Sequence, residues 1–194
     1  MVFDGRVYSI LLVSASEKFN ISIEKLLPEA AFSPVCHSRS AAAAKRELSG
    51  RSFDFVIINA PLPDNFGAEL AVDICSKGNS VCLIFVPADI CGDVNAKVSQ
   101  QGVMTLPKPA SAQMCAQALN WMISMRERLR RLEKKSASLE DRMQEIRIIN
   151  RAKWVLIDSQ KMSEQDAHRY IEKQAMDNCT TRLEIARNII RTCS

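Results

Sequence analysis

Residues that commonly do chemistry in proteins are sparse in this sequence. It has seven cysteines, none in a C-x-x-C pair, and two histidines, His37 and His168, without zinc-ligand spacing. No nucleophile–base motif and no glycine-rich phosphate loop is present. We therefore expect no metal site, no cofactor, no disulfide framework and no enzymatic activity. An odd number of thiols without a disulfide pattern is typical of a cytoplasmic protein.

Basic residues gather in the second half of the chain. Residues 1–111 hold 10 Lys and Arg against 11 Asp and Glu, a net charge of −1, and residues 112–194 hold 16 against 11, a net charge of +5. A basic half suits a polyanionic partner such as a nucleic acid. Long solvated helices are also rich in such residues, and charge alone favours that simpler interpretation.

The composition is that of a soluble globular protein. Of 194 residues, 47% are apolar and 25% charged, which is enough for a sizeable core. The longest apolar run, Val81–Val86, is far shorter than the roughly twenty residues of a membrane span. The N-terminus, Met1 to Arg6, has no signal-peptide pattern. We expect no membrane partner.

Strand and helix patterns alternate through the first 110 residues. Short apolar runs predict strands over 7–13, 32–37, 53–58, 81–86 and 103–106. The segments between them predict helices over 17–27, from an N-cap at Ser40 to Gly50, 66–77 and 93–101. This alternation predicts an α/β fold with a doubly wound, five-stranded parallel sheet. Ligands of such sheets bind beyond the carboxyl ends of the strands, near Ser14, Asn59, Pro87 and Lys108.

From residue 111 onward the pattern becomes purely helical, because no Pro or Gly follows Ala110. Apolar residues from Met122 to Ile146 recur at steps of 3 and 4, which predicts a parallel coiled coil; the alternative is a long helix packed on its own domain. Ser136 and Asn150 in this stripe would favour a two-stranded register. The expected dimer interface consists of Met125, Leu129, Leu132, Leu139, Met143 and Ile146.

Two capping boxes predict two short helices after the long one. Ser163 with Asp166 opens a helix that runs to about Met176, and Thr181 with Glu184 opens the last helix. Their apolar faces and that of the long helix can bury one another, which predicts a small three-helix bundle.

The tail contains the motifs Arg151-Ala-Lys-Trp-Val-Leu-Ile157, Ser163-Glu-x-x-Ala167, Tyr170-Ile171, Ala175-Met176 and Leu183-x-x-Ala186. Through these motifs it resembles the ANTAR domain over about residues 147–191. ANTAR domains are RNA-binding output modules of bacterial transcription antiterminators. Trp154 stands where the family usually has Gly, and we expect this ring to need burial of its own.

Two motifs follow strands of the predicted sheet: Asn59-Ala-Pro-Leu-Pro63 with Gly67, and Leu106-Pro-Lys108-Pro109 after the fifth strand. Their spacing is similar to the acceptor loop and the Lys-Pro of a response-regulator receiver domain, which has a CheY-like fold. The resemblance divides the chain into a receiver-like domain (1–110), a coiled-coil linker (111–146) and an ANTAR domain (147–194).

The phosphorylation chemistry that a receiver needs is missing from this sequence. An acyl phosphate requires a carboxylate, but Asn59 holds the acceptor position. Ser14-Ala-Ser16 replaces the acidic pair that binds Mg²⁺, and Pro87 replaces the hydroxyl residue. Only Lys108 remains; we expect it to bond loop carbonyls and Asn59, or else to serve a site for a sensor protein or small ligand. Asp64 is expected to be merely solvated.

The resemblance implies that a dimer presents two bundles to paired hairpins of a leader transcript. Sequence-specific RNA-binding proteins usually read unpaired loops. The residues expected to contact RNA are Arg151, Lys153, Tyr170, Lys173, Thr181, Arg182 and Arg187, with Tyr170 equally suited to core packing. A protein-interaction adaptor and a DNA-binding regulator are the alternative functions for the same basic tail.

Overall fold

The computed structural model describes residues 6–77 and 80–193. The expectation that the N-terminus has no signal peptide concerns residues 1–6, most of which lie outside the described residues. The chain forms two compact units, Met1–Arg130 and Arg131–Ser194, which we call the sheet domain and the helical tail. Among the described helices, none has the length and apolar character needed to cross a membrane.

The sheet domain is built on one parallel sheet, as the alternating pattern predicts. Its strands are β1 (Tyr8–Val13), β2 (Phe32–Ser38), β3 (Phe55–Asn59), β4 (Val81–Pro87) and β5 (Met104–Lys108). Their order is β2-β1-β3-β4-β5, and all four neighbouring pairs are parallel. The most apolar strands, β3 and β4, lie inside the sheet, where both faces are covered.

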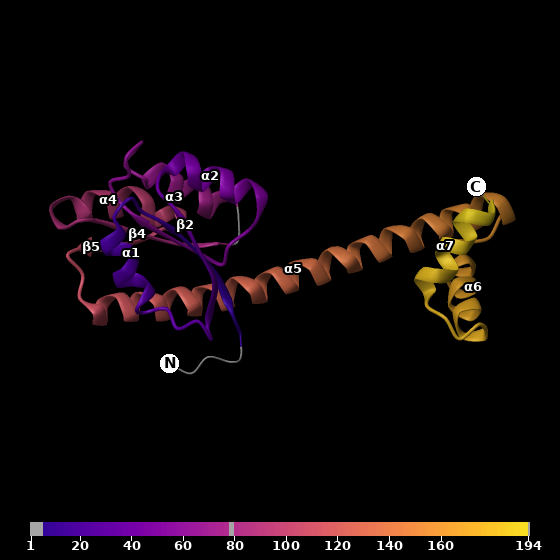
Figure 1. Cartoon of the computed structure of the whole chain (residues 1–194). Helices are drawn as coiled ribbons and strands as arrows, with labels where there is room; N and C mark the ends of the chain where they lie inside the picture. Colours follow the sequence, from indigo (N-terminus) through magenta and orange to yellow (C-terminus); the bar gives the residue numbers. More distant parts are fainter. Residues whose placement is uncertain (1–5, 78–79, 194) are drawn as a thin grey trace. The chain divides into compact units, whose positions relative to one another are not determined.

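Helices cover both faces of this sheet (Figure 1). On one face, α1 (Glu17–Glu24) and the start of α5 (Ala112–Gln160) pack against Leu12, Ile57 and Phe85. On the other face, α2 (Ala41–Gly50), α3 (Ala68–Lys77) and α4 (Cys91–Val98) pack against Val13, Ile58 and Ile84. The helix expected over 93–101 is thus shorter and shifted, because 3-10 turns at Ala88–Ile90 and Ser99–Gln101 flank α4.

The N-terminus of α2 is capped from two directions. Ser40 Oγ accepts the amide of Ala43 at 3.2 Å, as its sequence position predicts. The carboxylate of Asp64, in the loop after β3, accepts the amides of Ala41 and Ala42 at 2.9 and 2.8 Å. These two hydrogen bonds hold the pKa of Asp64 below its usual range. The expectation that Asp64 is merely solvated was therefore wrong.

The helical tail is a three-helix bundle formed by the end of α5, α6 (Glu164–Asp177) and α7 (Arg182–Cys193). Both expected caps are present: Ser163 Oγ accepts the amide of Asp166 at 3.1 Å, and Thr181 Oγ1 accepts that of Glu184 at 3.2 Å. The core of the bundle contains Ala152, Leu156, Ala167, Ile171, Ala175, Ile185 and Ala186.

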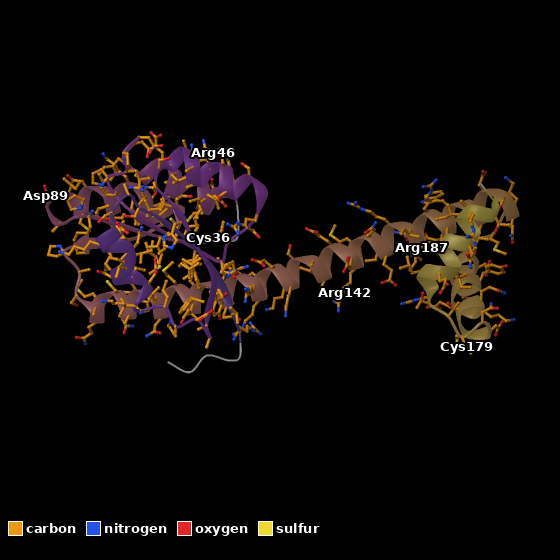
Figure 2. All side chains as sticks on the ribbon, viewed as in Figure 1. Cys36, Arg46, Asp89, Arg142, Cys179 and Arg187 are labelled. Carbon is orange, nitrogen blue, oxygen red and sulfur yellow. The ribbon has the colours of Figure 1, made fainter. Side chains whose placement is uncertain are left out.

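Helix α5 contributes its first turns to the sheet domain. Met122 is fully buried there, and Leu129 packs against the same core. The 3–4 stripe therefore begins as a face packed on its own domain. Beyond residue 130 the large apolar side chains of the stripe are exposed, and Figure 2 shows the surrounding side chains, Arg142 among them, projecting from the helix.

Candidate functional site

The sheet brings the expected degenerate phosphoacceptor residues together at one edge. Asn59 and Pro87 end β3 and β4, Lys108 ends β5, and Ser14 directly follows β1. In the sheet register Pro87 pairs with Lys108. Residues separated by up to 94 positions thus meet because parallel strands all end on the same side.

These side chains hydrogen-bond to one another. Lys108 Nζ donates to Asn59 Oδ1 at 2.8 Å and also to the carbonyl of Ala60. Asn59 Nδ2 donates to Ser14 Oγ at 3.0 Å, and Ser14 Oγ accepts the amide of Ser16 at 3.1 Å. Burial lowers the pKa of Lys108. The expected contacts of Lys108 with a loop carbonyl and Asn59 are confirmed.

The arrangement contains no carboxylate in the place of the nucleophile or the metal ligands. Ser16 instead caps α1, since its Oγ accepts the amide of Phe19 at 3.3 Å. Among the residues that the structure describes, no group of three or more His, Cys, Asp and Glu could hold a metal ion. Asp64 is occupied at α2, so it does not supply the missing acid.

The loop after β3 keeps its shape through Gly67, whose φ is +96°. A Cβ at this position would lie 3.0 Å from Ile58 Cγ2, so both backbone conformation and space require glycine. Gly67 therefore fixes the course of the backbone in the loop that follows Asn59.

An ion-pair cluster at the opposite ends of the strands was missed by sequence reasoning. Arg126 Nε and Arg130 Nη2 of α5 donate to Asp54 Oδ1 at 2.9 and 2.7 Å, and the amide of Ser9 donates to Asp54 Oδ2 at 3.0 Å. Asp54, just before β3, is 13% exposed. Burial raises the pKa of Asp54, but the hydrogen bonds and the two guanidinium charges lower it by more, so the net shift is downward. The sequence signal that could have indicated this cluster is an acidic residue between Phe53 and Phe55, at the start of a buried strand.

A second acid extends this cluster. Glu127 Oε1 accepts hydrogen bonds from the Tyr8 hydroxyl at 3.0 Å and from Arg130 Nη1 at 3.2 Å, and Glu127 also pairs with Arg6. The cluster joins the first turns of α5 to β1 and to the residue preceding β3. It therefore fixes that part of α5 on the sheet domain.

The basic residues among the expected RNA contacts fall into two groups. Lys153 and Arg182 are ion-paired: Lys153 Nζ lies 3.0 Å from Glu164 Oε1 with its side chain 16% exposed, and Arg182 Nη1 lies 3.2 Å from Glu172 Oε1. Arg151, Lys173 and Arg187 are exposed, and no ion pair to them occurs among the described residues. Figure 2 shows Arg187 on α7. The second group has its charge available for a phosphate.

The other two expected RNA contacts have structural roles. Tyr170 is half-buried and packs against the core of the bundle. Thr181 is exposed, and its hydroxyl accepts the N-terminal amide of Glu184 in α7. The backbone of Thr181 directly precedes α7, at the N-terminus of that helix.

The expected dimer interface divides along α5. Leu129 packs on the sheet domain. The other five residues are exposed, Met125 at 41%, Leu132 at 53%, Leu139 at 59%, Met143 at 56% and Ile146 at 58%.

Trp154 was expected to find its own burial, and this expectation was wrong. Its side chain is 70% exposed, because the faces of α5 that enter the bundle core carry Ala152 and Leu156 instead.

A five-stranded parallel sheet of this order, with the lysine and acceptor-loop positions at the carboxyl ends of its strands and a helical domain after it, is the architecture of a response regulator. The family description "ANTAR domain" matches residues 137–190. The chain is 29% identical over 140 residues to the transcriptional regulatory protein PdtaR of Mycobacterium tuberculosis H37Rv, covering 72% of this chain and 68% of the relative.

Solved structures of receiver domains share the fold of the sheet domain. The signal receiver domain of an HD domain-containing protein from Pseudomonas fluorescens Pf-5 has a TM-score of 0.58 and 25% identity, covering 68% of this chain and 97% of that one. A response regulator receiver domain from Clostridium thermocellum has a TM-score of 0.55 and 21% identity, covering 63% and 99%. Residues 137–190 thus match the ANTAR domain and the sheet domain has the receiver fold, an arrangement similar to that of an ANTAR response regulator with a receiver-like N-terminal domain.

Proposed function

We propose that this chain is an RNA-binding transcription antitermination regulator, which acts as a dimer on paired hairpins of leader mRNA and whose receiver-like domain is not phosphorylated by the ordinary route. The observation that carries the proposal is the match of the ANTAR domain to residues 137–190, the segment that contains the folded three-helix bundle. We propose the domain boundaries 1–110, 111–146 and 147–194.

Exposed cations on the bundle support RNA as the partner. Arg151, Lys173 and Arg187 have no ion pair among the described residues, so they can meet phosphates without first breaking one. Arg182 can join them, because an exposed pair such as that with Glu172 contributes at most about 1 kcal/mol. Lys153 is more buried and has to leave Glu164 first.

Dimerisation is assigned to the part of α5 beyond the sheet domain. Leu132, Leu139, Met143 and Ile146 recur at coiled-coil spacing and are all more than half exposed. Met125 continues the same stripe in the part of α5 that belongs to the sheet domain. Two weak hairpin contacts made by one dimer gain strength from high effective concentration.

Loss of phosphorylation is supported by the closed network at the carboxyl edge. Lys108, Asn59 and Ser14 satisfy one another, and no carboxylate stands where the acyl phosphate would form. On this basis the domain takes its input from a partner protein or a bound ligand, and the chain is a regulator without catalytic activity.

A gel-shift series that compares hairpin RNA with duplex DNA at several salt concentrations tests the RNA assignment. We expect the RNA to bind more tightly, with an affinity that falls steeply as salt rises, because phosphate contacts release counterions. Preferential binding of duplex DNA would identify a DNA-binding regulator instead. Binding of neither would leave the adaptor function.

A further inference from the structure

The helical tail exposes one large aromatic ring. Trp154 is 70% exposed on α5, whereas Ala152 and Leu156, two positions before and after it, are buried in the bundle core. An exposed tryptophan ring leaves a large apolar area in contact with water, which is unfavourable. Such a ring is typical of a surface that binds a partner.

The other ring-bearing side chains of the tail are already engaged. Tyr170 packs against the bundle core, and His168 Nε2 lies 3.4 Å from Glu172 Oε1. Residues 131–194 contain no Phe and no second Trp or Tyr. Trp154 is therefore the ring of this segment that is most accessible to a ligand.

Two arginines lie on the same side of α5 as this ring. Arg151 precedes Trp154 by three positions, which makes them neighbours on a helix, and Arg147 lies one turn further back. Both arginines are exposed, and neither has an ion pair among the residues that the structure describes. The nearest acid on this side, Asp158, lies 3.8 Å from Lys161, so its charge is partly offset.

An exposed ring beside two free guanidinium groups suits an unpaired nucleotide. A base stacks on an aromatic face whatever its identity, and the adjoining phosphates attract arginine. A paired stem offers only phosphates to such a site, because its bases are stacked on each other. A purely apolar protein partner would have to accommodate the charges of both arginines.

We propose that Trp154 is a stacking platform for an unpaired RNA base, with Arg151 and Arg147 contacting the phosphates next to it. This inference rests on the proposed RNA-binding function and adds a contact at a position where the family pattern has glycine. It adds a base-stacking contact on the exposed side of α5 to the phosphate contacts already proposed for the bundle.

The test uses the full chain and an RNA with two hairpins, whose loops are selected from a randomised library with the wild-type protein. We expect Trp154→Ala to weaken binding about tenfold, since removal of one stacking ring costs about 1–3 kcal/mol, and we expect Trp154→Phe to restore most of it. Met176→Ala, at another exposed apolar residue (78%), is the matched control and should bind like wild type.

A fluorescence measurement gives a readout that a merely structural role would not move. The chain has two tryptophans, so a Trp121→Phe background reports Trp154 alone. Loop RNA should quench its emission in a saturable manner, and a loop-free duplex of equal length should not. Equal quenching by the duplex, or none by the loop RNA, contradicts the inference.

Three further outcomes separate the possible failures. If Trp154→Ala binds the selected RNA like wild type, the stacking contact is absent while the proposed function stands. If it weakens binding only by converting dimers to monomers in sedimentation, the ring belongs to a subunit contact and the inference is overturned. If the wild-type chain selects no RNA, the proposed function fails and the inference fails with it.

Discussion

The ammonium group of Lys108 lies 2.8 Å from Oδ1 of Asn59, the residue that replaces the acceptor carboxylate. The same amide donates to Ser14, so a cation, an amide and a hydroxyl satisfy one another where a phosphoryl group and a metal ion would need free ligands. The carboxyl ends of the strands keep the receiver fold, but the carboxylates that would carry the phosphoryl group and the metal ion are absent from these positions.

Treatment of the chain with acetyl phosphate and Mg²⁺ should leave it unmodified. Asn59 cannot form an acyl phosphate, and Asp64 is held by two backbone amides of α2. Intact mass spectrometry checks the outcome. A stoichiometric, acid-labile phosphate would overturn the proposal that the domain escapes the ordinary route.

Replacement of Lys108 by Met should destabilise the sheet domain by about 1 kcal/mol. The change leaves the Asn59 and Ala60 oxygens without their shared donor, although partial exposure lets water replace some of it. Urea unfolding measures the loss. An unchanged free energy of unfolding would mean that this network has no structural importance.

Replacement of Asp54 by Asn should loosen the first turns of α5. The side chain is 13% exposed and accepts from Arg126 and Arg130, so we expect a loss of about 2 kcal/mol. Hydrogen exchange over residues 112–130 should accelerate. Asp73→Asn serves as the control, because its pair with Lys45 at 3.5 Å is exposed. Equal effects of the two changes would contradict the assigned role of the cluster.

Acid should weaken the sheet domain through the same cluster. The pKa values of Asp54 and Glu127 are lowered overall: burial raises them, but hydrogen bonds from Arg126 to Asp54 and from Arg6 and Tyr8 to Glu127 outweigh it. Each carboxylate has a lower pKa folded than unfolded, so its stabilisation is complete above about pH 5 and declines as pH falls through the folded value. Urea unfolding between pH 7 and pH 3 should show a smaller decline in Asp54→Asn than in wild type.

Replacement of both Leu132 and Leu139 by Asp should weaken the dimer. Both side chains are more than half exposed at coiled-coil spacing, and charged Asp residues there would not pack against a second copy. Sedimentation measures the association, with Ile21→Ser in α1 as an exposed apolar control (49%). A double variant that remains as dimeric as the control would place the interface elsewhere.

Local patterns predicted most of the elements because their causes are local. Ser40 and Ser163 cap helices through amides three residues away, and the continuous apolar run of β4 marks an inner strand. Spacing of 3 and 4 also placed Met122 and Leu129 on one face of a helix, but it could not say which surface that face meets. Here the surface is the sheet of the same domain.

Contacts between distant residues escaped prediction for the same reason. Asp54 bonds to arginines 72 and 76 positions later, and Asp64 caps a helix that starts 23 positions earlier. Family likeness predicted the loop at Asn59, and the capping boxes and apolar helix faces predicted the bundle. Trp154 departs from the family pattern, and its exposure depended on the fold. The pairing of Lys153 with Glu164 was likewise invisible in the sequence.

The most direct test of the central claim is the affinity of the full chain for paired-hairpin RNA, compared with Arg151→Glu/Arg187→Glu and with Arg142→Glu. Arg151 and Arg187 are exposed, unpaired cations within the described bundle, and Arg142 is an exposed arginine of α5 that is not among the expected RNA contacts. We predict that the double variant loses at least about tenfold in affinity through lost phosphate contacts, while Arg142→Glu changes it much less. Equal affinity of all three proteins, or no binding by wild type, would contradict an RNA-binding ANTAR surface on this bundle.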